Sequence, residues 1–140
     1  MSEENLRSVA LDRVESGRYE ATNVRGGTLA IGSGDDETFT PVELLLAAIA
    51  GCSAIDIDLI TGKRAEPSRF TAAVSGEKIR DELGNRLTGI TLTFDVEFPE
   101  GEAGDAARAV LPRSVQQSHD RLCTVSRTVE VGTPVSTGLA

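Results

Sequence analysis

The chain has 140 residues, of which 39% are hydrophobic and 26% charged, and its formal net charge is −8. This length fits one domain with its own hydrophobic core, and the composition is that of a soluble globular protein. The negative charge argues against nucleic acid and against an anionic membrane surface as partners, because both would repel the protein. We therefore expect a single domain over residues 1–140.

The first fifteen residues contain no basic start followed by an apolar block, so no secretory signal is expected. Two cysteines, Cys52 and Cys123, are too few for a disulfide scaffold in a chain of this size. These features predict a cytoplasmic protein. In a reducing compartment such a pair is more often reactive or metal-binding than a permanent disulfide.

The N-terminal third of the chain predicts short strands at 7–14, 18–23 and 28–31. Gly17 and the pair Gly26-Gly27 separate them and suit hairpin turns. A polar loop over 32–38 follows.

The most apolar segment predicts a long helix over about 41–64. Thr40 is a suitable N-cap, and Glu43 completes a capping-box pattern with it. Residues 44–55 are apolar on nearly every side, so we expect protein to cover most of this helix. Asp56 and Asp58 interrupt the apolar stretch, which argues against a membrane span.

The remainder of the chain predicts two further strands, near 70–74 and 90–98, because apolar and polar residues alternate there. A second helix is expected from near Asp105 towards Leu122, kinked or divided at Pro112. A short closing strand fits the last ten residues. The order of elements predicts an α+β fold.

Cys52 lies within the expected long helix, beside Gly51 and Ser53. Small neighbours give a substrate access to a reactive thiol, but they equally allow close packing of an inert core cysteine. Asp56, four residues further on, disfavours the thiolate form. A reactive Cys52 therefore requires a nearby cation, which the helix itself does not identify.

Cys123 has His119 four residues before it and Arg127 four residues after it. If this segment is helical, both lie on the face of Cys123, where positive charge would lower the pKa of its thiol. A zinc site is the alternative, with Cys52, Asp56, His119 and Cys123 as ligands from two helices. The absence of a CxxC spacing argues against zinc.

Three stretches in this order resemble the family of osmotically inducible protein C and organic hydroperoxide resistance protein: NVRGGTLAIG, FTPVELLLAAIAGC and SHDRLCTVSRT. The resemblance covers nearly the whole chain. It implies an α+β fold with antiparallel sheets around a long central buried helix and a second helix. It also implies that two chains interlock as a homodimer.

The resemblance further implies thiol-dependent peroxidase chemistry without a metal or an organic cofactor. Cys52 would attack the O–O bond and become a sulfenic acid, and Cys123 would resolve it as a disulfide that a dithiol or another thiol reduces. Arg25, in the N-terminal strands, is the candidate for the family's activating arginine. The family's glutamate position, ten residues before the cysteine, is Val42 here, and the adjacent Glu43 is explained by helix capping.

The leading hypothesis is a cytoplasmic, homodimeric hydroperoxide reductase, an antioxidant enzyme of the oxidative stress response. An organic peroxide is the expected substrate, because the surroundings of Cys52 are apolar (Leu44, Leu45, Ile49 and Ile55). Two alternatives stay open: a catalytically weak protein that binds a small apolar or thiol-reactive ligand, and a zinc-stabilised structural protein.

Overall fold

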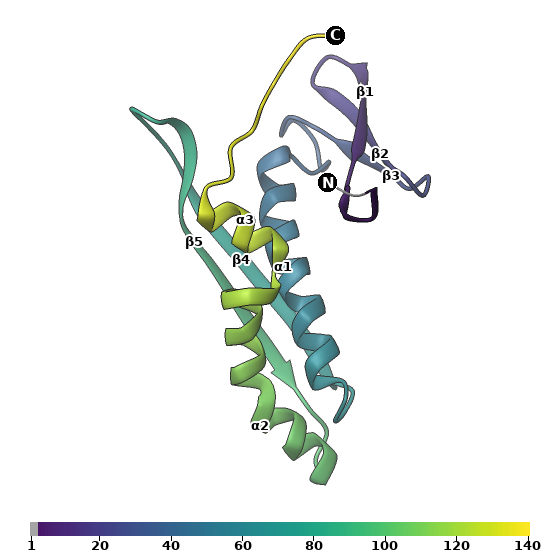
Figure 1. Cartoon of the computed structure of the whole chain (residues 1–140), viewed down its shortest axis with the longest axis vertical. Coiled ribbons are helices and arrows are strands. Elements are labelled where there is room, and N and C mark those ends of the chain that lie inside the picture. The colour runs from purple at the N-terminus through teal and green to yellow at the C-terminus, as the bar shows by residue number, and fades with distance from the viewer. Residues whose placement is uncertain (1–2) are drawn as a thin grey trace. The chain divides into compact units, whose positions relative to one another are not determined.

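The computed structural model describes residues 3–140 and divides them into two compact units (Figure 1). The N-terminal unit ends at Leu45, and the C-terminal unit is Leu46–Ala140. The expected α+β class is confirmed: one unit has a three-stranded antiparallel sheet, the other a two-stranded antiparallel sheet, and there are three α-helices among the described residues.

The N-terminal unit contains β1 (Val9–Glu15), β2 (Arg18–Asn23) and β3 (Thr28–Ile31), in the order β1-β2-β3, after a short 3₁₀ turn, η1 (Glu3–Asn5). The predicted strands are confirmed to within two residues. Gly17 and Gly26 have φ angles of 74° and 87°. The turns between these strands therefore use a conformation that residues with a Cβ rarely adopt.

Helix α1 (Pro41–Thr61) begins with the predicted capping box. The Thr40 amide donates to Glu43 Oε1 at 2.8 Å, and the Glu43 amide donates to Thr40 Oγ1 at 3.2 Å. These two bonds satisfy amides that have no partner inside the helix. The capping explanation for Glu43 is therefore confirmed.

One stripe of α1 is buried within the chain, at residues four apart: Ile49, Ser53, Ile57 and Thr61. The expectation that protein covers most of the helix is not met within one chain, because Ile55 and Leu59 are 62% and 67% exposed. By length and apolar composition, α1 is the one helix among residues 3–140 that could cross a membrane. This is weak evidence, since core helices of soluble proteins pass the same test.

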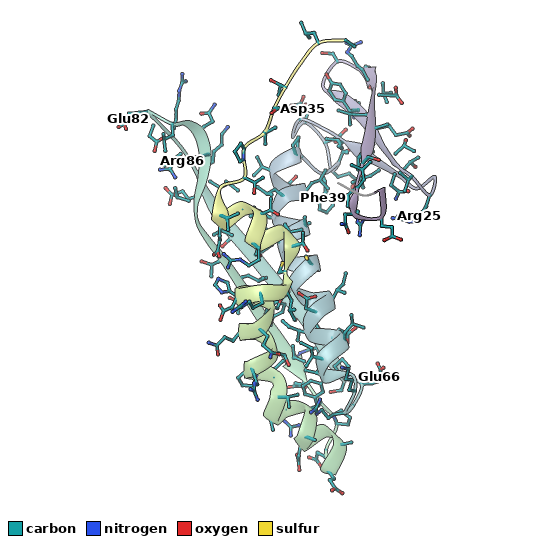
Figure 2. All side chains as sticks on the ribbon, in the orientation of Figure 1. Arg25, Asp35, Phe39, Glu66, Glu82 and Arg86 are labelled. Atoms are coloured by element: carbon teal, nitrogen blue, oxygen red, sulfur yellow. The ribbon has the colours of Figure 1, made fainter. Side chains whose placement is uncertain are left out.

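The C-terminal unit is built on a long hairpin of β4 (Arg69–Asp81) and β5 (Gly84–Glu97). The strands are longer than predicted, and the expected loop shrinks to Glu82 and Leu83 (Figure 2). Phe70 and Phe94 pack edge to face with ring centroids 6.0 Å apart. The predicted alternation of β5 is confirmed, because Ile90, Leu92 and Phe94 turn to the less exposed side.

Three helical segments complete this unit: α2 (Glu102–Gln117), the π-helical turn η2 (Ser118–Leu122) and α3 (Thr124–Val131). Pro112 lies inside α2 without dividing it. The chain changes course at η2, between green α2 and yellow α3 in Figure 1. The predicted closing strand is wrong: α3 ends at Val131, its C-cap Gly132 has a left-handed φ of 70°, and residues 133–140 form no strand.

Candidate thiol site

Cys52 occupies the middle of α1 and is half-buried. The adjacent Gly51 is exposed, and a Cβ placed on it would meet no atom within 4 Å. Burial raises the pKa of the Cys52 thiol, and the neighbouring Cys123 and Asp56 raise it further. A hydrogen bond from the Val125 amide acts in the opposite direction. On balance the protonated thiol is favoured.

Cys123 is fully buried and lies between η2 and α3. Its backbone is extended (φ −72°, ψ 98°), and its side chain caps α3. Cys123 Sγ accepts a hydrogen bond from the Ser126 amide at 3.4 Å, and its thiol donates to Ser126 Oγ at 3.3 Å. The thiol is therefore anchored in the first turn of α3.

The expected helical arrangement around Cys123 is wrong, because the backbone at Cys123 is not helical. His119 bonds instead to Asp120 through Nδ1 (2.8 Å) and to Glu130 through Nε2 (3.2 Å). The Arg127 guanidinium donates to the carbonyl of His119 and pairs with Glu130. These side chains connect η2 to α3 and are not hydrogen-bonded to the thiol.

The two thiols are nevertheless neighbours within one unit. The Cys123 thiol is close enough to raise the pKa of Cys52, and both are free cysteines. Two successive amides in the first turn of α3 act on the two sulfurs: the Ser126 amide donates to Cys123 Sγ, and the Val125 amide lowers the pKa of Cys52. Residues 71 positions apart in the sequence thus form one pair of neighbouring thiols at the start of α3.

Beside this pair lies a buried chain of hydroxyls that sequence reasoning missed. Ser118 Oγ donates to Asp56 Oδ2 at 2.9 Å and lies 2.9 Å from Ser53 Oγ. Because Ser118 gives its proton to the carboxylate, Ser53 must be the donor to Ser118. The four-residue repeat of Ser53 with Ile49 and Ile57 marked a buried position, but nothing in the sequence paired Ser53 with Ser118.

A cavity of about 290 Å³ adjoins the thiol pair in the same unit. Neither cysteine lines it, but Ser53 follows Cys52 in the chain and Ser126 contacts Cys123. Of the apolar residues predicted around the site, Ile49 lines the cavity, whereas Leu44, Leu45 and Ile55 do not. The lining is mostly apolar, with four polar residues: Ile49, Ser53, Ile90, Leu92, Phe94, Val115, His119, Ser126, Val129 and Glu130.

Arg25, the predicted activating residue, lies in the N-terminal unit, at the turn between β2 and β3 (Figure 2). It is exposed, and its backbone amide donates to the Asn23 side chain at 2.9 Å. With Leu6, Arg7 and Val9 it lines a separate cavity of about 360 Å³ in that unit. Its role at Cys52, which belongs to the other unit, remains a prediction.

The predicted zinc ligands do not form a cluster. Over residues 3–140, no group of three or more His, Cys, Asp or Glu side chains is placed to hold a metal ion. Asp56 is engaged by Ser118, and His119 is engaged by Asp120 and Glu130. The side chains proposed for zinc are therefore used in other contacts.

Comparison with known proteins identifies the family of this chain. Uncharacterised proteins of Mycobacterium tuberculosis and Mycobacterium bovis are 31% identical over 128 residues, which is 90% of this chain and 90% of theirs. An OsmC-like protein of unknown function from Vibrio cholerae has a similar fold, with 16% identity, coverage of 93% of this chain and 95% of that one, and a TM-score of 0.73.

The organic hydroperoxide resistance protein OhrB of Bacillus subtilis also has a similar fold, with 16% identity, coverage of 91% and 92%, and a TM-score of 0.57. These structural likenesses concern the fold alone. The family model for OsmC-like protein matches residues 34–138, which include both cysteines and exclude Arg25. The chain belongs to the OsmC-like protein family.

Proposed function

We propose that this protein is a thiol-dependent peroxidase that reduces organic hydroperoxides. The observation that carries the proposal is the proximity of two free thiols, Cys52 and Cys123, at the start of α3. A cysteine that only packs in the core does not require a second thiol as its neighbour. A two-cysteine redox cycle requires this proximity, because direct disulfide formation depends on the sulfurs meeting.

The proposed cycle has three balanced steps. Cys52 attacks the distal oxygen of the hydroperoxide, the O–O bond breaks, and the thiol proton ends on the alkoxide, which leaves as an alcohol. The resulting sulfenic acid reacts with the Cys123 thiol to give a disulfide and water. A dithiol reductant then restores both thiols by exchange and leaves as its own disulfide.

The raised pKa of Cys52 limits the first step, because the thiolate is the nucleophile. The Val125 amide opposes this effect only in part. Arg25, at the turn between β2 and β3, is therefore proposed as the additional activating group. A guanidinium near the sulfur would lower the pKa of Cys52 and stabilise the leaving alkoxide.

The mostly apolar cavity beside Ser53 and Ser126 favours an organic peroxide over hydrogen peroxide. Its volume of about 290 Å³ is at the lower end of the range for small-molecule sites. The organic group of the substrate would occupy this cavity, with the peroxide oxygens directed towards Cys52.

We also propose that the enzyme is a cytoplasmic homodimer. The exposed face of α1 carries Ile55 and Leu59, and the N-terminal strands expose Val9, Leu11 and Val14. Exposed apolar side chains on each of the two units are typical of surface that associates with protein. An interlocked second copy would cover it.

The test is a peroxidase assay with cumene hydroperoxide and dithiothreitol on wild type, Cys52→Ser and Cys123→Ser. Wild type should consume peroxide, Cys52→Ser should show only the rate of the reductant alone, and Cys123→Ser should accumulate a sulfenic acid that dimedone traps. Ser114→Ala serves as the control, since Ser114 is buried in α2 and bonds only to the Val110 carbonyl of its own helix. Equal rates for wild type and Cys52→Ser would refute the peroxidase function.

A second function, binding of a small apolar or thiol-reactive ligand, is favoured by the same cavity and by the raised pKa of Cys52. In that case Cys52 would react slowly with peroxides while the cavity still binds an apolar molecule. Titration of the Cys52→Ser variant with an environment-sensitive fluorescent fatty acid separates the two functions. Tight binding with no peroxide consumption by wild type would support the binding protein.

A further inference from the structure

Ser126 is the side chain shared by the resolving thiol and the cavity. Its hydroxyl lies 3.3 Å from Cys123 Sγ, and the residue lines the cavity beside the thiol pair. Its own amide donates to the same sulfur at 3.4 Å. Ser126 is half-buried, so its hydroxyl is sheltered from bulk water yet reachable from the cavity.

The first turn of α3 places both sulfurs near the positive end of a helix. The amides of Val125 and Ser126 have no acceptor inside α3; the Ser126 amide donates to Cys123 Sγ, and the Val125 amide lowers the pKa of Cys52. Negative charge on sulfur is stabilised at such a position. This arrangement lowers the cost of charge on either sulfur during exchange, but it supplies no group that can carry a proton.

The other polar side chains near Cys52 and Cys123 form hydrogen bonds with groups other than the thiols. The hydroxyls of Ser53 and Ser118 form the chain that ends on Asp56. Both ring nitrogens of His119 are bonded to carboxylates. Among the residues that the structure describes, the hydroxyl that contacts the Cys123 sulfur is that of Ser126.

We propose that Ser126 is a further catalytic residue, which relays the proton in the step that joins the two sulfurs. The proposal rests on the peroxidase cycle above. As Cys123 Sγ attacks the Cys52 sulfenic acid, the S–S bond forms and the S–O bond breaks. The Cys123 thiol proton passes to Ser126 Oγ, and the proton of that hydroxyl passes to the departing hydroxide, which leaves as water. Ser126 ends the step unchanged.

The experiment compares wild type with Ser126→Ala, Ser126→Thr and the control Ser114→Ala. Each reduced protein is oxidised with excess hydrogen peroxide, and quenched samples are analysed by mass spectrometry for the disulfide and for the dimedone adduct of Cys52. Loss of a general acid–base group slows a step by about 100-fold or more, so Ser126→Ala should form the disulfide about 100-fold more slowly and accumulate the adduct. Ser126→Thr, which keeps a hydroxyl, should restore most of the rate.

A purely structural role for Ser126 is distinguished by the solvent deuterium isotope effect on disulfide formation. If Ser126 relays the proton, wild type should form the disulfide more slowly in D2O than in H2O, and this difference should be smaller in Ser126→Ala. If Ser126 serves only packing, the isotope effect should be the same in both proteins. Thermal unfolding of each variant verifies that it folds. A wild-type disulfide rate in Ser126→Ala, or an unchanged isotope effect, would overturn the relay.

Failure of the peroxidase function gives a different result. In that case Cys52 of wild type is oxidised no faster than a free thiol by cumene hydroperoxide. Excess hydrogen peroxide still oxidises Cys52 to the sulfenic acid slowly. The ratio of disulfide to dimedone adduct, at a fixed dimedone concentration, then compares the rate of the resolution step between wild type and the variants. The relay is therefore tested whether or not the peroxide assay succeeds.

Discussion

The two cysteines of this chain are held in opposite ways. Cys52 lies within a regular helix, and its pKa is set by burial, by Val125 and Cys123 at the start of α3, and by Asp56 of its own helix. Cys123 lies at a break between two helical segments, fully buried, with its sulfur fixed by its own first turn. The comparison teaches that the environment of Cys52 combines burial with residues from two parts of the chain, whereas Cys123 is held by a residue three positions further along the chain.

The largest expected effect concerns the hydroxyl of Ser118, which links η2 to α1. Ser118→Ala removes the donor to the partly buried Asp56 carboxylate and the acceptor of Ser53. A lost hydrogen bond to a charged group costs about 2 kcal/mol, so the free energy of unfolding should fall by that amount in urea denaturation. Ser114→Ala, which breaks a neutral bond to its own helix, should cost about 1 kcal/mol. Equal losses would show that the hydrogen bonds of Ser118 to α1 contribute no more than one neutral hydrogen bond within a helix.

The second prediction concerns the raised pKa of Cys52. Burial favours the protonated thiol, so the reactive thiolate is a minor species at neutral pH. The rate of alkylation by iodoacetamide in Cys123→Ser should rise about tenfold per pH unit between about pH 6 and pH 8, followed by mass spectrometry. A rate that levels off below about pH 8 would mean that distant groups lower the pKa of Cys52 more than burial raises it.

The third prediction tests the tuning by Asp56. Its negative charge raises the pKa of Cys52 from four residues away. Asp56→Asn keeps an acceptor for Ser118 and removes the charge, so alkylation of Cys52 at pH 7 should become about threefold faster. Asp58→Asn on the exposed side of α1 is the matched control and should leave the rate unchanged. Similar rates in the two variants would exclude tuning by Asp56.

The smallest expected effect concerns the stabilisation that protonated His119 provides. The hydrogen bonds to Asp120 and then Glu130 raise the pKa of His119, so the folded protein holds this proton more tightly than the unfolded chain. The stabilisation is therefore complete below the unfolded pKa of about 6.5 and is lost as the pH rises through the higher folded pKa. Because His119 is 58% exposed, the gain should be small.

The measurement for His119 is the melting temperature of wild type and His119→Gln at about pH 5.5 and about pH 8. Wild type should gain slightly more than the variant at the lower pH. A difference between the two proteins that does not change with pH would contradict the assignment of this effect to the protonation of His119.

Much of the fold followed from local sequence signals. Thr40 and Glu43 predicted the start of α1, and the alternation of Ile90, Leu92 and Phe94 predicted β5, because capping and strand periodicity depend on neighbours in the chain. The closing strand and the helical backbone at Cys123 were predicted wrongly. The π-helical turn before Cys123 begins at Ser118, which bonds to Asp56 of α1 62 positions away, and local patterns do not encode a contact at that separation.

The candidate site was predictable in its cysteines but not in its surroundings. The motifs around Cys52 and Cys123 indicated a pair, since both lie in stretches that resemble one family. Ser126, Ser118 and Val125 carried no signal, because their roles arise from an amide or a hydroxyl that any loop or helix can supply. Arg25 and Cys52 belong to different units, so a contact between them depends on how the units assemble. Sequence patterns describe neighbours along one chain and do not predict such an assembly.

The exposed apolar face of α1 has a further consequence for how the protein responds to dilution. In the proposed homodimer this face is covered by the second copy, so folding free energy and association free energy cannot be separated. The melting temperature should then rise with protein concentration, and a dilute sample should lose its structure at a lower temperature than a concentrated one. The cellular abundance of the protein would thus set its stability.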